Sequence, residues 1–327
     1  MNRNNAIIYV IVVILLVGAG LYYFTKNKNN IPNTPIVSES SIKGCYVSIR
    51  NKDVYTLEIR KDEGSHIEGV LAYNNYGYDS SSGTFIGTYA NGILSGNYSF
   101  EAEGAHSERQ LIWKKEGNNF VQGFGDTETF DGKEVISDIN KVVYNPSFTF
   151  EKRDNCIVSF TDRNNTFTFD YNSFFKGVEG ENTPTTDWKL DSKEKGILLA
   201  SVIVPKTYMP GTNFSEARLT IGRVTSPKGI KSCTVDTNNE KKDGEKNIDI
   251  YTFTKFTSND AAAGNRYDTT SYRGIMDGDC YALEYTIHST NIDNYPPEQQ
   301  IKEFDKTKIQ SDLEKIISSF EFLISSD

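Results

Sequence analysis

The sequence predicts an N-terminal transmembrane helix followed by an all-β domain, a calycin-like meander barrel, and an α+β domain. Three observations predict this fold class: an uncharged run near the start, a series of short alternating segments separated by turn residues, and an amphipathic segment near the end. A chain of 327 residues is also long enough for two domains of ordinary size. We expect an anchor at 1–25, a linker at 26–42, and domains at 43–140 and 146–325.

The run at 6–24, AIIYVIVVILLVGAGLYYF, carries no charged residue and is just long enough to cross the hydrocarbon layer of a bilayer as a helix. The membrane is therefore an expected partner. A short N-terminus before such a run resembles a signal anchor, which exports the remainder of the chain. We expect a single-pass membrane protein with its N-terminus in the cytoplasm and an extracytoplasmic body. The alternative is cleavage after Ala19, at a signal-peptidase site.

The linker at 26–42 is rich in Asn, Pro and Ser and has neither a helical nor a strand period. It is expected to be a flexible tether.

The net charge of −9, with lysines scattered along the chain, argues against nucleic acid as a partner. The sequence contains no P-loop, dinucleotide fingerprint, HExxH or GxSxG motif. We therefore expect no cofactor and favour a binding protein over an enzyme, without excluding an enzyme.

The four cysteines are Cys45, Cys156, Cys233 and Cys280, with no CxxC pair and no metal-ligand spacing. No metal site is expected. An oxidising location would permit disulfides, and Cys233 with Cys280 is the favoured pair because both lie beside strands of the second domain. The alternative is four buried free thiols, which pack as small hydrophobes.

The first domain has strand patterns with only short breaks between them, so sequence neighbours are expected to be neighbours in the sheet. Asn91 and Gly92 predict a tight two-residue hairpin, since both residues accept positive φ. Closure into a barrel would hide the sheet edges. The interior is expected either to be filled by side chains or to hold a small apolar ligand. The predicted strands are 45–50, 54–60, 66–73, 84–89, 93–100, 109–114 and 120–125.

The second domain combines strands with one amphipathic helix near the end of the chain. Ile309, Leu313, Ile316, Ile317 and Phe320 recur at helical spacing and form one apolar stripe. Asp305 or Thr307 is expected to cap the helix. The strands are predicted at 156–160, 166–171, 197–204, 217–221, 248–256 and 280–287.

The order of these elements resembles the PsbP-like α/β/α sandwich family over residues 148–323. The resemblance rests on FTFDY, ILLASVIV, SEARLTIG and a closing helix that runs into SFEFL. It also extends, over the whole chain, to uncharacterised bacterial membrane-anchored proteins. Known members of the PsbP-like family are accessory proteins of photosystem assembly and a nuclear import cofactor. The resemblance therefore implies binding or assembly rather than catalysis.

The long segment between 256 and 280 is the main candidate site, since long connections in compact domains are often functional. Its polar side chains suit a polar ligand or a protein partner. The alternative is one helical turn over 261–264 on a solvated surface, capped by Asp260. The candidate binding residues are Asp260, Asn265, Arg266, Tyr267 and Arg273, together with His288 on the following strand.

His288 shares a strand face with Glu284, and such a pair either transfers protons in a hydrolase or forms a plain hydrogen bond. No catalytic residue is assigned, because no nucleophile stands at a recognisable spacing. The expected function is non-enzymatic binding or assembly outside the cytoplasm. The alternatives are a small-ligand carrier that uses the barrel, and a hydrolase.

Overall fold

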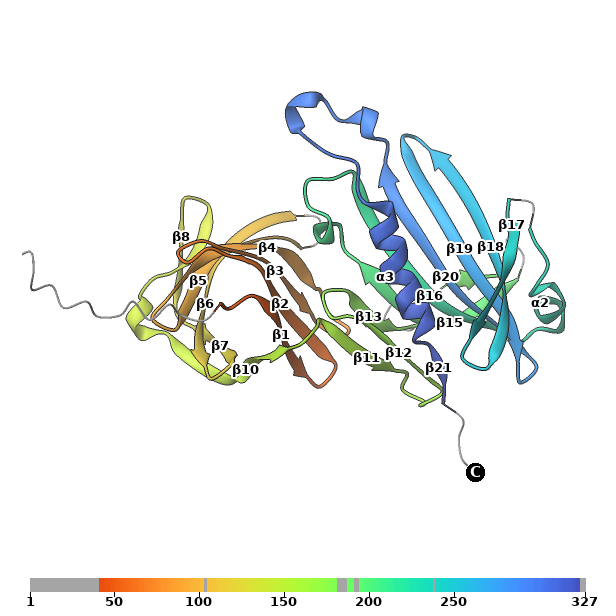
Figure 1. Cartoon of the computed structure of the whole chain (residues 1–327), viewed down its shortest axis with the longest axis horizontal. Coiled ribbons are helices and arrows are strands. Elements are labelled where there is room, and N and C mark those ends of the chain that lie inside the picture. Colours follow the sequence, from red (N-terminus) through yellow and green to blue (C-terminus); the bar gives the residue numbers. More distant parts are fainter. Residues whose placement is uncertain (1–40, 103–104, 181–186, 191–193, 238, 324–327) are drawn as a thin grey trace, which may run out of the picture. The chain divides into compact units, whose positions relative to one another are not determined.

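The computed structural model describes residues 41–102, 105–180, 187–190, 194–237 and 239–323. The described residues from Ile42 onward belong to one compact unit. Within these ranges the strands form three sheets (Figure 1): a closed barrel, a large open sheet and a small three-stranded sheet.

The barrel is closed by eight antiparallel strands. Consecutive strands pair from β1 to β7, and β10 fills the gap between β7 and β1, so every strand has two neighbours. The predicted β-barrel is confirmed. Asn91 and Gly92 have φ of 54° and 76° between β4 and β5, which confirms the predicted tight hairpin. The strands are β1 (Gly44–Arg50), β2 (Asp53–Asp62), β3 (Ile67–Asn74), β4 (Ser81–Ala90), β5 (Ile93–Ala102), β6 (Ala105–Glu116), β7 (Asn119–Phe124) and β10 (Val143–Arg153).

A small hairpin interrupts the chain between the last two barrel strands. It consists of β8 (Thr127–Phe130) and β9 (Lys133–Ile136), followed by the 3-10 helix η2 (Ile139–Lys141). The hairpin is attached to β6, where Glu134 pairs with Arg109.

Large side chains fill most of the barrel interior. Trp113, Phe85 and Phe150 pack edge to face in one layer, with ring centroids 5.3 and 6.1 Å apart. Tyr46 and Phe120 form a further aromatic contact at 4.8 Å. All five are fully buried. The body of the barrel is therefore a packed core.

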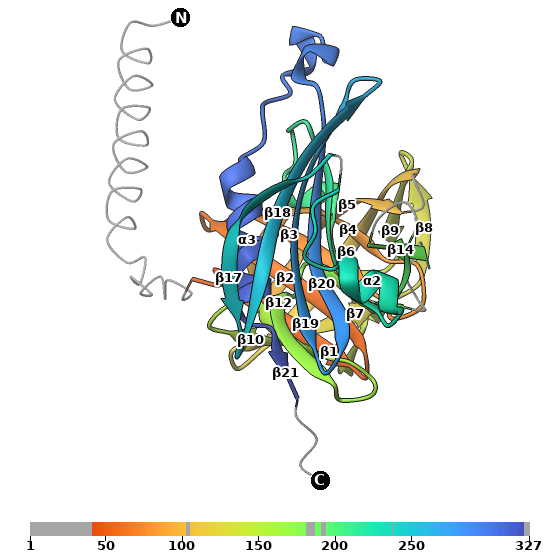
Figure 2. The same ribbon diagram turned by 90° about the vertical axis from the view of Figure 1, so that its right-hand side faces the viewer.

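The open sheet is antiparallel and contains longer strands, which run side by side in Figure 2. Its order is β13, β15, β16, β20, β19, β18 and β17, with β14 paired to β15. The strands are β13 (Lys176–Glu179), β14 (Asp187–Lys189), β15 (Lys195–Val204), β16 (Phe214–Val224), β17 (Lys241–Ile248), β18 (Tyr251–Ala262), β19 (Asn265–Met276) and β20 (Asp279–Thr290).

Short elements complete this half of the chain. β11 (Ile157–Thr161), β12 (Phe167–Asn172) and β21 (Glu321–Phe322) form the small sheet. After β20 the chain makes an excursion through η5 (Ile292–Asn294) and η6 (Pro297–Gln299) and returns to α3 (Lys306–Ser318), as Figures 1 and 2 show. The other short helices are η4 (Lys206–Tyr208) and α2 (Pro227–Ser232).

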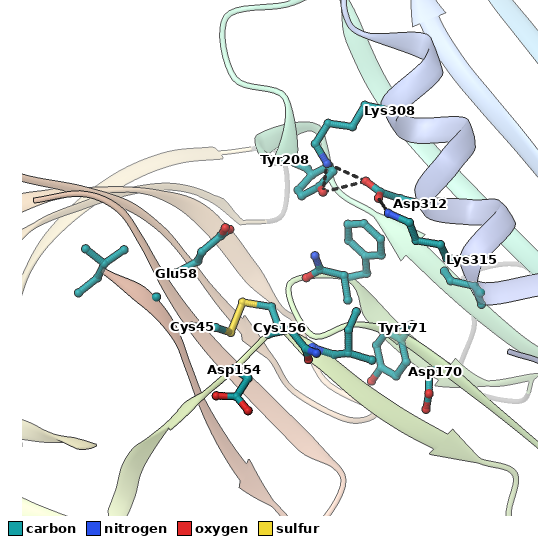
Figure 3. A pocket seen from close by; sticks show the side chains of 17 residues that line it. Cys45, Glu58, Asp154, Cys156, Asp170, Tyr171, Tyr208, Lys308, Asp312 and Lys315 are labelled. Atoms are coloured by element: carbon teal, nitrogen blue, oxygen red, sulfur yellow. Dashed lines mark hydrogen bonds and ion pairs between the residues drawn. A yellow bond between two sulfur atoms is a disulfide. The ribbon is translucent and has the colours of Figure 1, made fainter. Parts of the chain in front are cut away.

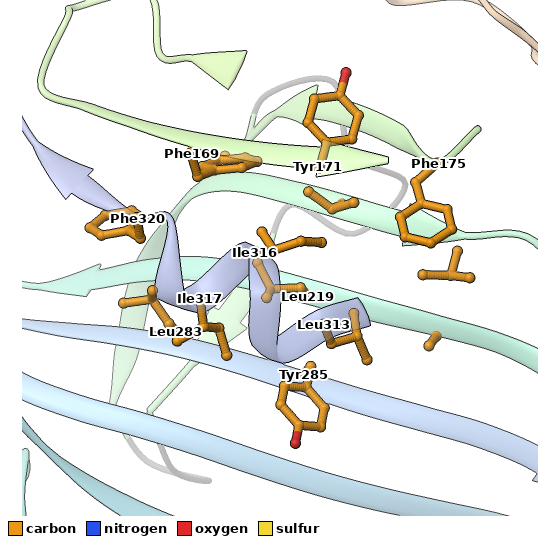
Figure 4. Close-up of a cluster of buried hydrophobic side chains, with 14 of the residues drawn as sticks. Phe169, Tyr171, Phe175, Leu219, Leu283, Tyr285, Leu313, Ile316, Ile317 and Phe320 are labelled. Atoms are coloured by element: carbon orange, nitrogen blue, oxygen red, sulfur yellow. The ribbon is translucent and has the colours of Figure 1, made fainter. Parts of the chain in front are cut away.

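Helix α3 confirms the predicted amphipathic helix. The Asp305 carboxylate accepts a hydrogen bond from the Lys308 amide at 2.9 Å and caps the helix, as one of the two predicted caps. Its apolar stripe packs between the large sheet and the small sheet (Figure 4). Leu313 and Ile317 lie near Leu219 and Leu283 of the large sheet in this view. The helix is thus held by buried apolar surface on one face.

The predicted α+β, PsbP-like sandwich is wrong. Two α-helices, α2 and α3, are present in the described ranges, and the second half of the chain is mostly β. The physical reason lies in 256–280, which continues the strands β18 and β19 instead of forming a loop or a helical turn. A single long helix covers part of one sheet face, whereas an α/β/α sandwich needs helices on both.

No helix in the described part of the chain has the length and apolar character that crossing a bilayer requires. The segment 6–24, where a transmembrane helix was predicted, lies outside the described residues. The predicted single-pass location with an extracytoplasmic body therefore has no support in the described part of the chain.

All four cysteines are paired in disulfides. Cys233 is joined to Cys280, at the end of the large sheet, and Cys45 of β1 is joined to Cys156, just before β11. The Cys45–Cys156 bridge connects the barrel to the small sheet. The alternative of four free thiols does not apply.

Candidate functional site

The segment expected to be a binding loop is a β-hairpin. Ala261 pairs with Arg266, and the turn lies at Ala263 and Gly264, which have φ of 49° and 79°. Its strands belong to the large sheet, so the polar side chains of this segment point to opposite sheet faces in alternation.

Three of the expected site residues form one row across the sheet. Asp260 pairs with Tyr267, and Tyr267 pairs with His288. The Tyr267 and His288 rings are stacked, with centroids 4.5 Å apart. The His288 ring also contacts Asn265 Oδ1 through Nε2 at 2.9 Å. Arg266 is exposed nearby and donates to Asn291 Oδ1 at 3.4 Å.

Arg273 does not belong to this group. Seven residues of extended strand separate it from Arg266, which amounts to about 23 Å. Arg273 is 1% exposed, and its guanidinium binds both carboxylate oxygens of Glu240, with Nη1 to Oε2 at 3.0 Å. Its Cζ also lies 4.6 Å from the centre of the Phe256 ring. Arg273 is therefore part of the interior.

His288 and Glu284 occupy the same face of β20, as expected from their spacing. Four residues of strand separate them by about 13 Å, which is too far for a hydrogen bond between the two side chains. The ring nitrogen contact of His288 is to Asn265 instead. The geometry therefore offers no His288–Glu284 pair for proton transfer.

A hollow at the mouth of the barrel is lined by aromatic side chains and is large enough for a small ligand. Strand ends from around the barrel surround a hollow of about 340 Å³. Tyr55 and Tyr73 meet edge to face at 5.1 Å, and Phe124 meets Phe148 at 4.8 Å. We call this hollow the barrel mouth; its lining residues are Tyr55, Tyr73, Asn75, Asp79, Ser80, Ser81, Phe100, Arg109, Leu111, Gln122, Phe124 and Phe148.

Polar groups hold the aromatic rings of the barrel mouth in place. The Tyr73 hydroxyl donates to Gln122 Oε1 at 3.1 Å, and the Tyr55 hydroxyl donates to Asn75 Oδ1 at 3.0 Å. Burial raises the pKa of Tyr73 and of Tyr55, so both phenols stay protonated at neutral pH. The barrel mouth is thus a preformed apolar cup with fixed polar groups.

A second cavity, of about 430 Å³, is bounded by barrel strands β1 and β2, by β12 and by α3 (Figure 3). The Cys45–Cys156 disulfide lies on one side of it, and Tyr208, Lys308, Asp312 and Lys315 lie on the other. Asp312 accepts hydrogen bonds from the Tyr208 hydroxyl at 2.9 Å, from Lys308 at 2.7 Å and from Lys315 at 3.2 Å. Lys308 also donates to the Tyr208 oxygen.

This cluster is internally satisfied, which favours a structural role. Burial by itself would raise the pKa of Asp312, but hydrogen bonds from Lys308 and Tyr208 outweigh it, so the pKa lies below its ordinary value. Two residues further along α3, Glu314 accepts from Tyr272, Tyr285 and Lys246 at 2.6, 3.0 and 2.6 Å. These contacts fix the helix to η4 and to the sheet.

Because the pKa of Asp312 is lower in the folded chain than in the unfolded chain, its ionised form stabilises the fold above the unfolded pKa of about 4. That contribution is lost as the pH falls through the folded value. We expect Asp312→Asn to be less stable than the wild type at pH 7. The difference should shrink between about pH 4 and pH 2. Urea unfolding at several pH values measures this, and a constant difference down to pH 2 would contradict the assignment.

Metal binding finds no support among the residues that the structure describes, because they contain no cluster of three or more His, Cys, Asp or Glu side chains that could hold an ion.

Sequence reasoning gave a ligand carried by the barrel as an alternative but identified none of the residues that line the barrel mouth. Alternation along β2 does place Tyr55, Leu57 and Ile59 on one face, and this was the available signal. The pattern does not show which strand ends meet, because Phe148 falls in a segment expected to belong to the second domain.

Comparison with known proteins finds that no family model matches this chain, and no curated protein matches it either.

Proposed function

We propose that this chain is a small-ligand binding protein whose ligand occupies the barrel mouth. The observation that carries the proposal is the contrast between a filled barrel body and an open aromatic cup at one end. A volume of about 340 Å³ lies at the lower end of the range for small-molecule sites.

The lining defines the ligand class as a small, flat and mainly apolar molecule with a polar edge. The rings of Tyr55 and Tyr73 offer faces and edges for a planar ring. Phe148 packs beside them under the Arg50 guanidinium, whose Cζ is 3.9 Å from the ring centre. Gln122 and Arg109 offer polar atoms beside them. Binding requires no catalytic group, which agrees with the motif-poor sequence.

The fluorescent dye anilinonaphthalene sulfonate is a suitable probe because it is flat, largely apolar and brighter in apolar surroundings. We expect one dye molecule to bind the native protein saturably. Leu111→Trp should fill the cup and weaken dye binding by about tenfold or more, equivalent to about 1.4 kcal/mol. Fluorescence titration measures both affinities, and circular dichroism establishes that each variant is folded.

Ile86→Trp is the matched control, since Ile86 is 53% exposed on the outer wall of β4. It introduces the same side chain away from the mouth and should leave dye affinity unchanged. Equal binding by wild type and Leu111→Trp, or no saturable binding by the wild type, would refute the proposal.

A further inference from the structure

A groove next to the barrel mouth lies where the barrel meets the polar face of the large sheet. Its volume is about 630 Å³. Barrel residues Ser80 to Ser82 and Glu101 line one side, and Lys176, Lys206 and Arg218 line the other. We call it the basic groove. It gathers three cationic side chains and two carboxylates in a protein whose net charge is −9.

Sheet register places two of the cations in one row. Lys176 pairs with Ile203, and Ile203 pairs with Arg218. Cross-strand partners share a sheet face, so the two cationic side chains flank Ile203 at a spacing of about 10 Å between their backbones. An anionic group above Ile203 would lie within reach of both.

Lys176 is half-buried, and its one hydrogen bond within the described ranges is to the Tyr78 backbone oxygen at 2.9 Å. Partial burial of this ammonium lowers its pKa. The nearby Asp79 carboxylate opposes this shift, and a bound anion would add a further anionic partner for the ammonium.

The rest of the groove carries neutral donors and acceptors. Ser82 and Thr207 bond through their hydroxyls at 2.6 Å across the groove, and Ser215 bonds to Thr290 at 3.3 Å. Hydroxyl groups held in this way keep further lone pairs for a ligand. Glu101 and Glu216 add acceptors for ligand hydroxyls.

The basic groove leads onto the stacked rings of Tyr267 and His288. Glu216 lines the groove and pairs across strands with His288, which is stacked on Tyr267. Aromatic faces beside a hydroxyl-rich groove suit a ring with one apolar face, such as a sugar ring.

We propose that the basic groove binds an acidic oligosaccharide. The carboxylate of one sugar unit lies between Lys176 and Arg218, its hydroxyls contact Ser82, Thr207 and Glu216, and the next unit stacks beside His288. The groove and the barrel mouth share Ser80 and Ser81, but this proposal does not rest on the ligand proposed for the mouth.

The probe is a trimer of galacturonic acid, and the neutral trimer of galactose is its counterpart. We expect calorimetry to show that the wild type binds the acidic trimer more weakly at higher salt and has no measurable affinity for the neutral trimer. Lys176→Met should weaken binding by about tenfold, as expected for the loss of one charged hydrogen bond. Lys206 also lines the groove, and its side chain is exposed, so Lys206→Met leaves the interior intact. This second variant should also bind the acidic trimer more weakly.

Lys242→Met is the matched control, because Lys242 is an exposed lysine on β17 and does not line the groove. It should bind the acidic trimer like the wild type. Three results would overturn the proposal: no binding of the acidic trimer by the wild type, equal binding of the neutral trimer, or unchanged affinity in both groove variants.

Discussion

Replacing Cys45 and Cys156 together by alanine is expected to lower the free energy of unfolding by about 2–5 kcal/mol. The bridge closes a segment with a sequence separation of 111 residues. In the chain-entropy model, a crosslink over so long a loop removes much of the freedom of the unfolded chain, worth about 5 kcal/mol.

The second bridge provides a quantitative comparison. Cys233 and Cys280 are separated by 47 residues, so the same model gives about 4 kcal/mol. On loop length alone, loss of the Cys45–Cys156 bridge should therefore lower the free energy of unfolding by about 0.8 kcal/mol more than loss of the Cys233–Cys280 bridge. Packing also differs, since Cys233 and Cys280 lie in a small apolar cluster with Leu190, Leu198, Val224 and Ala282.

Urea unfolding of the two double variants, followed by circular dichroism, measures these differences. The Cys45→Ala/Cys156→Ala variant should unfold at a clearly lower urea concentration than the oxidised wild type. If it unfolds at the same concentration, the bridge between the barrel and the small sheet does not restrain the unfolded chain.

The barrel was predictable because its signals are local. Alternation, short breaks and the Asn91-Gly92 turn each depend on a few adjacent residues. The strand that closes the barrel, β10, was not predictable, because it pairs with β1 and β7 across long separations in sequence. Pro146 also precedes Phe148 and Phe150 of β10 and suggested a boundary there.

In the second half of the chain, the helix was predictable but part of the large sheet was not. The apolar stripe of α3 was sufficient to predict the helix, but the polar segment around 260–273 gave no strand signal. Its residues Asp260 and Asn265 disfavour strands by propensity, and pairing with β18 and β20 overrides that preference. The stacked Tyr267–His288 pair depends on register, which no local pattern specifies.

Glu240→Ala is expected to destabilise the protein by about 3–5 kcal/mol, because it leaves the Arg273 guanidinium buried without its carboxylate partner. Arg273 is 1% exposed, so water cannot replace the lost contacts without opening the sheet. Replacing both residues by methionine removes the charge and its partner together and should cost much less than the sum of the single changes. Urea unfolding of Glu240→Ala, Arg273→Met and the Met/Met variant measures the coupling.

This cycle separates two roles for an arginine that the sequence grouped with binding residues. A surface arginine that contacts a ligand would change affinity but hardly change unfolding, since exposed ion pairs contribute little. An interior arginine does the reverse: the folded Met/Met variant should bind the dye and the acidic trimer like the wild type. Additive effects of the two single changes would show that Arg273 and Glu240 do not act as a pair.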